Sequence, residues 1–345
     1  MSPAQEPAQE IEALAKLYVG VVGTKPIEPS QHRTGGPEVS MDPLSDVLSL
    51  LESRSYAAGG FPLGTDLAVQ FHEYEGIKCY AVASGECWLS VEGVSEPLLL
   101  KAGDCILLPR GRRFLLATDL SHPAIDAEVF RRTRLSTGEP PPHEGQGPYI
   151  VGGYFHLAGP HAAFLLEVLP PVVHIRDDAQ KATMRWSLER LRDELRTPQP
   201  GGSLMAQQLA FTMLIQALRL RLVDPAFRGV GWLFALADKQ MNAAIVRMHA
   251  DPAHPWTVKE LAACVGMSRS VFALRFKETV GSTPMEYLTR WRMLQASQRL
   301  ERSSDSISDI ACSLGYESDG AFRKAFRGVT GCSPREYGRS ARHAG

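Results

Sequence analysis

The spacing of hydrophobic residues divides the chain into a strand-rich region followed by helices. Between residues 67 and 118, short hydrophobic runs alternate with tight-turn signals such as Ser84-Gly85 and Glu92-Gly93. The expected strands are Leu67–Phe71, Lys78–Ala83, Glu86–Val91, Pro97–Leu100, Cys105–Leu108, Phe114–Thr118 and Tyr149–Phe155. Many short strands at this spacing predict a β-sandwich or a small β-barrel.

On both sides of this region, hydrophobic residues recur at the spacing of a helix. A helix is expected to begin at Asp42-Pro43, because proline is favoured in the first turn and hydrophobic residues follow at helical spacing. Two further helices are expected at Trp186–Arg196 and Leu204–Val223. The second is apolar around much of its circumference, so it must be buried against either a partner subunit or the β-domain.

An internal repeat with a period of 49 to 50 residues occupies the carboxyl end. Each copy has a capping-box pattern, an apolar-Ala pair, a glycine, a serine that can cap a second helix, and two phenylalanines. The first copy has Thr257, Glu260, Leu261-Ala262, Gly266, Ser268, Phe272 and Phe276; the second has Ser306, Asp309, Ile310-Ala311, Gly315, Ser318, Phe322 and Phe326. A short helix, a glycine turn and a second helix make a helix-turn-helix unit.

The distribution of charge points to a polyanionic partner at the same end. Residues 238–345 contain 16 Lys and Arg against 11 Asp and Glu, a net charge of +5, whereas residues 1–237 have a net charge of −6. A helix from Pro284 to about Glu301 joins the two repeat copies. If it is rigid, the two second helices should enter successive major grooves of double-stranded DNA, roughly 34 Å apart.

The repeat also carries the motifs of a known family. Ser268-Arg269-Ser270, Gly315-Tyr316-Glu317-Ser318 and Ser333-Pro334-Arg335-Glu336-Tyr337 resemble the AraC/XylS family of transcription regulators. The resemblance implies that bases are read by Arg269, Ser270, Ala273 and Leu274 in the first copy and by Asp319, Gly320, Arg323 and Lys324 in the second. Lys277 and Arg327 lie at matching places and are expected to hold phosphates, while the four phenylalanines are expected to be core.

Two of these positions depart from the family pattern. Relatives often have polar or basic residues where this chain has Ala273 and Leu274. These side chains either contact a thymine methyl group or leave the first copy with less specificity than usual. We therefore expect the two recognition helices to divide the work unequally.

Residues 41–172 resemble the cupin-type sensor domain of one branch of that family. The matching stretches are Gly85-Glu86-Cys87-Trp88-Leu89, Gly103-Asp104, Leu108-Pro109-Arg110-Gly111 and Leu169-Pro170-Pro171. Metal-binding cupins place H-x-H where this chain has Lys78-Cys79-Tyr80, and a second histidine where it has Phe114. We therefore expect no metal, cofactor or catalytic residue, which disfavours the alternative of a cupin-fold enzyme with a DNA-binding appendage.

The sensor is expected to hold a small organic effector of unknown identity. Its apolar and aromatic walls would come from Phe71, Tyr80, Trp88 and Phe114. An alternative is a thiol-based redox switch that uses Cys79, Cys87 or Cys105, although buried inert thiols are the favoured interpretation.

These patterns together predict a multidomain α+β chain. It has a flexible leader (1–40), a cupin-like sensor domain with an amino-terminal β-barrel (41–172), a helical linker with a dimerisation role (173–235), and an all-α tandem helix-turn-helix domain (236–345). The expected partners are double-stranded DNA, a second copy of the chain, the effector and, as a candidate, RNA polymerase. Scattered cysteines, and the absence of a signal peptide or membrane-length apolar run, predict a cytoplasmic protein.

Overall fold

The computed structural model describes residues 42–50, 55–137, 147–156, 159–197, 199–223 and 229–343. The predicted leader, residues 1–40, lies outside these ranges. The described residues group into two compact units. The first, the β-unit, lies within residues 53–158 and 169–221; the second, the helical unit, lies within residues 29–52, 159–168 and 222–345.

The β-unit contains two five-stranded sheets. The first sheet is antiparallel, in the order β1 (Ser55–Pro62), β9 (Tyr149–His156), β3 (Ile77–Ser84), β6 (Cys105–Leu108), β10 (Val173–Ile175). The second has the order β5 (Leu98–Lys101), β4 (Glu86–Val91), β7 (Phe114–Ala117), β2 (Ala68–Phe71), β8 (Ala124–Asp126), with β2 and β8 parallel. The cupin-like fold is confirmed, but these sheets are not closed, so the predicted β-barrel is better described as a sandwich.

The alternation of side chains along the strands builds the core of the sandwich. In β4, Cys87, Leu89 and Val91 are buried and belong to the core, while Trp88 and Ser90 between them are only half-buried. Successive side chains of a strand point to opposite faces, so Trp88 points away from the interior that its neighbours fill. The helix α3 (Ala127–Thr137) contributes Phe130 to the same core.

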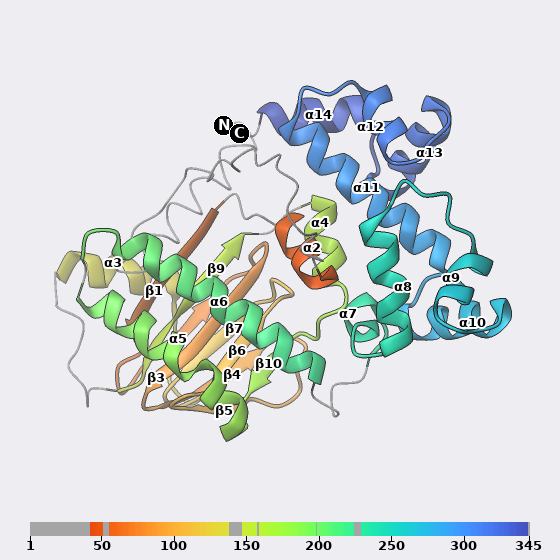
Figure 1. The fold of residues 1–345 in the computed structure, drawn as a ribbon. Coiled ribbons are helices and arrows are strands. Elements are labelled where there is room, and N and C mark those ends of the chain that lie inside the picture. The colour runs from red at the N-terminus through yellow and green to blue at the C-terminus, as the bar shows by residue number, and fades with distance from the viewer. Residues whose placement is uncertain are drawn as a thin grey trace. The chain divides into compact units, whose positions relative to one another are not determined.

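Two long helices lie against the first sheet (Figure 1), and the first of them packs on β1, β3 and β9. They are α5 (Asp178–Arg196) and α6 (Gly202–Val223). The first begins eight residues before the predicted Trp186 because Asp177 caps it, accepting hydrogen bonds from the Ala179 and Gln180 N–H groups. The ring of Phe211 in α6 lies 6.0 Å from that of Phe155 in β9, so one face of this apolar helix packs against the β-domain.

The helical unit contains both repeat copies. The first copy consists of α9 (Val258–Cys264) and α10 (Arg269–Val280), and the second of α12 (Ile307–Ser313) and α13 (Asp319–Thr330). The helix α11 (Pro284–Arg302) joins them, with the copies at its two ends (Figure 1). The unit is completed by α2 (Pro43–Leu50), α4 (Gly159–Leu166), α7 (Trp232–Ala235), α8 (Lys239–Ala250) and α14 (Pro334–His343).

Two helices from the predicted sensor sequence, α2 and α4, pack inside the helical unit. The Phe164 ring of α4 stacks on Trp232 with centroids 5.2 Å apart, and the Trp232 indole N–H donates to the Phe164 carbonyl oxygen at 2.8 Å. His161 donates from Nε2 to the carbonyl oxygen of Leu294 in α11 at 2.8 Å. Contacts between distant parts of the sequence therefore build the surroundings of α11.

A buried histidine ties α2, α8 and α11 together. His249 of α8 lies 2.9 Å from Asp46 Oδ2 through Nδ1 and 2.8 Å from the Tyr287 hydroxyl through Nε2, and its ring stacks on Trp291 at 3.8 Å. Because a carboxylate only accepts, Nδ1 carries the proton and Nε2 of a neutral ring accepts from Tyr287. Burial lowers the pKa of His249, although Asp46 acts in the opposite direction.

Within the described ranges, every helix is either too short or too polar to span a lipid bilayer.

Candidate DNA-binding surface and effector core

The helices of both repeat copies begin at the predicted caps. Thr257 Oγ1 accepts from the Glu260 N–H at 3.2 Å, and Glu260 Oε2 accepts in return from the Thr257 N–H at 2.8 Å. In the second copy Ser306 accepts from the Asp309 N–H, but the shorter Asp309 side chain reaches the Ser306 hydroxyl rather than its backbone. The capping box is therefore complete only in the first copy.

Each copy turns sharply at its glycine. Gly266 and Gly315 have φ values of 70° and 77°, in the left-handed region that favours glycine. At Gly315 a Cβ atom would also lie 2.2 Å from the backbone carbonyl oxygen of Ala253, so a side chain cannot be placed there without a shift of the backbone. The tight turn lets the second helix of each copy project from its supporting helix.

The predicted DNA-contacting residues lie on one outer face of each recognition helix. In α10 and α13 the phenylalanines Phe272, Phe276, Phe322 and Phe326 are fully buried, which confirms that they are core. The opposite faces expose Arg269, Ser270, Leu274, Lys277, Gly320, Arg323, Lys324 and Arg327, with Ala273 and Asp319 half-buried. The structure thus brings the predicted residues of each copy together at the surface.

In α13 the acidic residue organises the neighbouring arginine. Asp319 Oδ2 accepts from the Ser308 hydroxyl of α12 at 2.8 Å and lies 3.7 Å from the Arg323 guanidinium. One carboxylate therefore links the two helices of the unit and restrains Arg323, whose side chain remains exposed. The matched places in the first copy hold Lys259, Arg269 and Ala273, which cannot form the same arrangement.

The first recognition helix is held by an arginine that sequence reasoning missed. Arg275 of α10 donates to Asp238 Oδ2 at 2.5 Å and to Gln240 Oε1 at 2.9 Å. Asp238 also caps α8; partial burial raises the pKa of its carboxyl, but hydrogen bonds from the Met241 N–H and from Arg275 lower it overall. The second copy has Ala325 at the matched place, so only α10 is anchored in this way.

Three of the four predicted effector residues lie together in the sandwich core. Phe114 stacks on Phe71 with ring centroids 4.5 Å apart, and Tyr80 lies 6.3 Å from Phe114. Trp88 is on the other face of β4 and does not join them. Where a metal-binding cupin would present a histidine, Phe114 contributes only ring carbons to this stack.

Lys78 lies inside this aromatic group, although a lysine is not expected in a hydrophobic core. Its side chain is buried, with 2% of the residue exposed. The ammonium nitrogen lies 4.2, 4.9 and 5.0 Å from the ring centroids of Tyr74, Phe114 and Phe71. Aromatic faces attract a cation, so these rings offset part of the cost of burying the charge.

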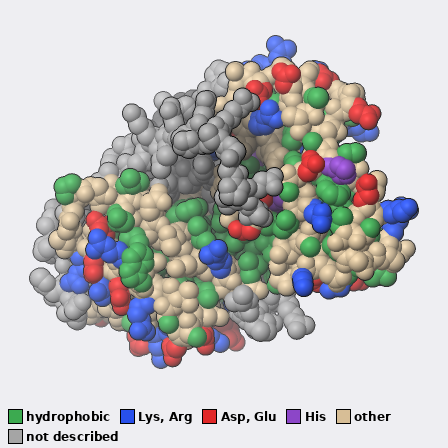
Figure 2. All heavy atoms as spheres, in the orientation of Figure 1, with side chains coloured by type: hydrophobic (Ala, Val, Ile, Leu, Met, Phe, Trp, Pro, Cys, Tyr) green, Lys and Arg blue, Asp and Glu red, His purple; other side chains and the backbone are tan. Residues whose placement is uncertain are grey.

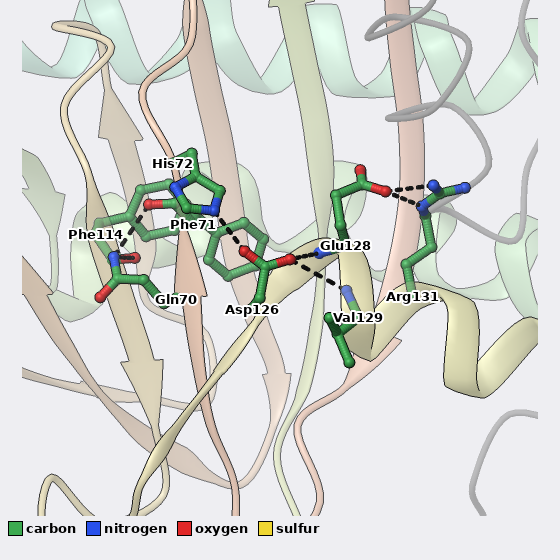
Figure 3. A network of polar contacts seen from close by, with 8 residues as sticks. All are labelled: Gln70, Phe71, His72, Phe114, Asp126, Glu128, Val129 and Arg131. Carbon is green, nitrogen blue, oxygen red and sulfur yellow. Dashed lines mark hydrogen bonds and ion pairs between the residues drawn. The ribbon is translucent and has the colours of Figure 1, made fainter.

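A histidine that follows Phe71 directly in the sequence has a structural role (Figure 3). His72 pairs with Asp126, whose other carboxylate oxygen caps α3 by accepting from the N–H groups of Glu128 and Val129 at 2.8 and 3.2 Å. Beside them, Gln70 donates to the carbonyl oxygen of Phe114 at 2.9 Å. Within the described part of the chain, no group of three or more His, Cys, Asp and Glu side chains is placed to hold a metal ion.

The three cysteines of the redox alternative do not form one cluster. Cys79 and Cys105 have sulfur atoms 4.0 Å apart on β3 and β6, whereas Cys87 lies in the core between the sheets. The hydrogen bond with Cys105, together with burial, raises the pKa of Cys79, and burial raises the pKa of Cys87 to about 12. Protonated, buried thiols react slowly with oxidants, so this geometry does not favour a redox switch.

Similarity to known proteins agrees with this architecture. A cupin family model matches residues 42–222, and a helix-turn-helix domain model matches residues 261–340. A putative AraC-like transcription regulator of Streptomyces antibioticus is 41% identical over 299 residues, covering 86% of this chain and 98% of that protein. Its counterpart from Streptomyces lividans is 39% identical over 298 residues, with the same coverages.

A solved structure is similar to the carboxyl-terminal part. It is the DNA-binding domain of AdpA in complex with a target DNA, which is 34% identical, has a TM-score of 0.28, and covers 29% of this chain and 90% of that one. From the family models and the two Streptomyces relatives, we conclude that this chain belongs to the AraC-like transcription regulators and joins a cupin domain to a helix-turn-helix domain.

Proposed function

We propose that this protein regulates transcription by placing α10 and α13 in two successive major grooves of one DNA duplex. The observation that carries the proposal is the pair of matched recognition helices, each with its core face buried and its cation-bearing face exposed. The helix between the two copies has 19 residues. It is therefore about 28 Å long, comparable with the roughly 34 Å of one DNA turn.

In this proposal the residues of the two faces have separate tasks. Arg323 and Lys324 donate to base edges, with Asp319 restraining Arg323. Lys277 and Arg327 lie at matched places nearer the ends of their helices, where contact with phosphates fixes the register of the protein on the duplex. Arg269, Ser270 and Ala273 complete the first face, and Gly320 leaves space for the backbone of α13 to approach the DNA.

Mapping of bound sites across the genome is the experiment that tests this function. The wild-type protein should occupy discrete promoter-proximal sites that share one sequence motif. Arg323→Ala should change the motif or abolish occupancy, whereas a matched surface substitution in the β-unit, Arg176→Ala, should leave the map unchanged. Absence of any shared motif, or an unchanged map for Arg323→Ala, would contradict the assignment of α13 to a groove.

We further propose that the sensor binds an apolar effector carrying an anionic group. The support is Lys78, whose ammonium lies among Phe71, Tyr74 and Phe114 in the core of the sandwich. An anionic group would be attracted to this buried cation, and the rings, with Tyr80, offer apolar contacts. Trp88 lies on the other face of β4, so we do not include it.

Thermal unfolding with matched ligand pairs tests the effector class. Aromatic and aliphatic carboxylates, beginning with benzoate, are compared with their amides, which have nearly the same shape but no charge. Some acids should raise the unfolding temperature of the wild type while their amides do not, and Lys78→Met should remove the difference. Equal stabilisation by acid and amide would overturn the proposal.

A homodimer is the proposed oligomeric state. Hydrophobic side chains gather over α5 and α6 in Figure 2, and Trp186, Leu204 and Met205 are exposed on these helices, Trp186 by 68%. A dimer would place two DNA-binding domains on paired half-sites and could present both to RNA polymerase. Sedimentation equilibrium should give twice the chain mass for the wild type and a weaker association constant for Trp186→Ser.

A further inference from the structure

We infer that the two recognition helices read DNA through different chemistry, and that α10 selects thymine by contact of Leu274, flanked by Val271, with the C5 methyl group. This inference rests on the proposed placement of α10 in a major groove. It assigns a specificity-determining role to Leu274 and a chemical identity to the bases beneath α10.

The first observation is that two large hydrophobic side chains of α10 are exposed, although other hydrophobic residues of this helix already form its buried core face. Leu274 is 61% exposed and Val271 is 55% exposed. The residues that pack into the unit from α10 are Phe272, Phe276 and Val280, which are buried. Leu274 and Val271 are three residues apart, so they are neighbours on the helix surface and form one small apolar patch.

The second observation comes from the same places in the other copy. Fifty residues further along the chain, Leu274 corresponds to Lys324, Ala273 to Arg323 and Val271 to Ala321. Both helices have a serine cap, two buried phenylalanines and a glycine at the carboxyl end. On a shared scaffold, α13 therefore presents hydrogen-bond donors where α10 presents methyl groups.

The surroundings of the patch favour DNA as the occupant. Arg269 and Lys277 are exposed on the two sides of Leu274 along α10. Lys277 can hold a phosphate, which would leave Leu274 and Arg269 facing base edges. Glu278 is the one exposed carboxylate in the helix; it lies a full turn beyond Leu274, towards the carboxyl end. Of the four base pairs, only those containing thymine present a methyl group in the major groove, and apolar side chains recognise it.

The orientation of α10 is fixed well enough for such a contact to discriminate. Arg275 anchors the helix to the start of α8 through Asp238 and Gln240. Phe276 also packs edge-on against Tyr287 of α11, with ring centroids 5.9 Å apart. A methyl contact is short-ranged, so it requires a helix that is held in this way.

Substitution of deoxyuridine for thymine tests the inference, because deoxyuridine pairs like thymine but lacks the C5 methyl. The full chain is first used to select a binding site from a random duplex library, and each thymine is then replaced singly. Affinities are measured for the wild type, Leu274→Ala and the matched variant Lys324→Ala. Both substituted positions are exposed, so the helices should form in all three proteins.

At one or two positions, loss of the methyl should weaken the wild type by about fourfold, as expected for one buried methyl group. Leu274→Ala should bind the thymine and deoxyuridine sites equally at those positions, and Lys324→Ala should keep the fourfold difference. 5-Methylcytosine at the same positions should bind the wild type more tightly than cytosine does.

Two negative results have different meanings. If the library yields an enriched sequence but no deoxyuridine effect depends on Leu274, the methyl readout is wrong while the DNA-binding function stands. If no sequence is enriched at all, the proposed function itself fails, and the inference fails with it.

Discussion

Lys277 and Arg327 occupy matched places in α10 and α13, exposed and away from the buried phenylalanines. We propose a different role for them from that of Arg323, whose exposed guanidinium lies 3.7 Å from the Asp319 carboxylate. At the scale of single residues, we therefore distinguish cations expected to bind any DNA from groups expected to discriminate between sequences.

Removal of a phosphate-binding cation should act on all sequences alike. Lys277→Ala or Arg327→Ala should weaken binding to the selected site and to random DNA by similar factors. The slope of log affinity against log salt concentration should fall by about one unit for each variant. Arg323→Ala is the matched comparison, and it should reduce the ratio of specific to random binding. A specific loss for Lys277→Ala, with random binding unchanged, would place that residue on a base.

The buried His249 should make the stability of the helical unit depend on pH. Burial lowers its pKa in the folded state, below the ordinary value of 6.5. The unfolded chain therefore binds more protons in the window between the lowered value and 6.5. Stability is fully present above 6.5 and is lost as the pH falls through that window.

Denaturant unfolding at pH 7.5 and pH 5.5 measures this loss. The wild type should lose free energy of unfolding at the lower pH, and His249→Gln should lose less, because it removes the titrating ring. His122→Gln, a half-exposed position in the β-unit, is the control and should behave like the wild type. An identical pH dependence in His249→Gln would show that another group is responsible.

At the scale of elements, the sequence predicted well those features that depend on interactions between residues close together in the chain. The helices of the repeat were predictable because their caps and turns are local. Thr257 and Ser268 cap helices by bonding to backbone groups three residues away, and Gly266 and Gly315 form turns through their own backbone conformation. The strands β1, β8 and β10 were missed; in β1, residues 57–60 are Ala-Ala-Gly-Gly, which lack the large β-formers that signal a strand.

Features built by distant contacts were not visible in the sequence. Lys78 follows the hydrophobic Ile77 on β3 of the first sheet, and the packing of the two sheets brings Phe71 of β2 and Phe114 of β7 close to it. The packing of α4 against α7 and α11 depends on residues more than sixty positions away, such as Trp232, 68 residues from Phe164. No local pattern distinguishes such a helix from one that covers its own β-sheet.

The position of α4 gives an element-level prediction. Phe164→Ala removes the ring that stacks on Trp232 and contacts Tyr287, so it should destabilise the helical unit by about 3–5 kcal/mol. Hydrogen–deuterium exchange should increase in α7 and α11. Leu116→Ala, a buried core position in β7, is the matched control and should raise exchange in the β-unit instead. Increased exchange confined to the β-unit in Phe164→Ala would contradict this role.

At the scale of the whole molecule, the chain passes between the two units several times rather than once. The helical unit takes α2 and α4 from the residues that the cupin family model matches. From α2 onward, the chain therefore passes between the two units four times. We propose that this shared construction makes the sensor and the DNA-binding elements interdependent. An effector that changes the conformation of the β-unit could then act on the residues around α11 through the chain segments that lead to α2 and α4. These connections exist in addition to the linker that follows α6.

Two unequal recognition helices should bind one specific DNA site, and the affinity of the full chain for a selected duplex measures this binding. Fluorescence anisotropy of the full chain should show binding to the selected site about a thousandfold or more tighter than to a scrambled duplex, at physiological salt. A duplex with half a helical turn inserted between the two groove contacts should lose most of that preference, because α11 fixes their separation. Equal affinity for the selected, scrambled and lengthened duplexes would contradict the account.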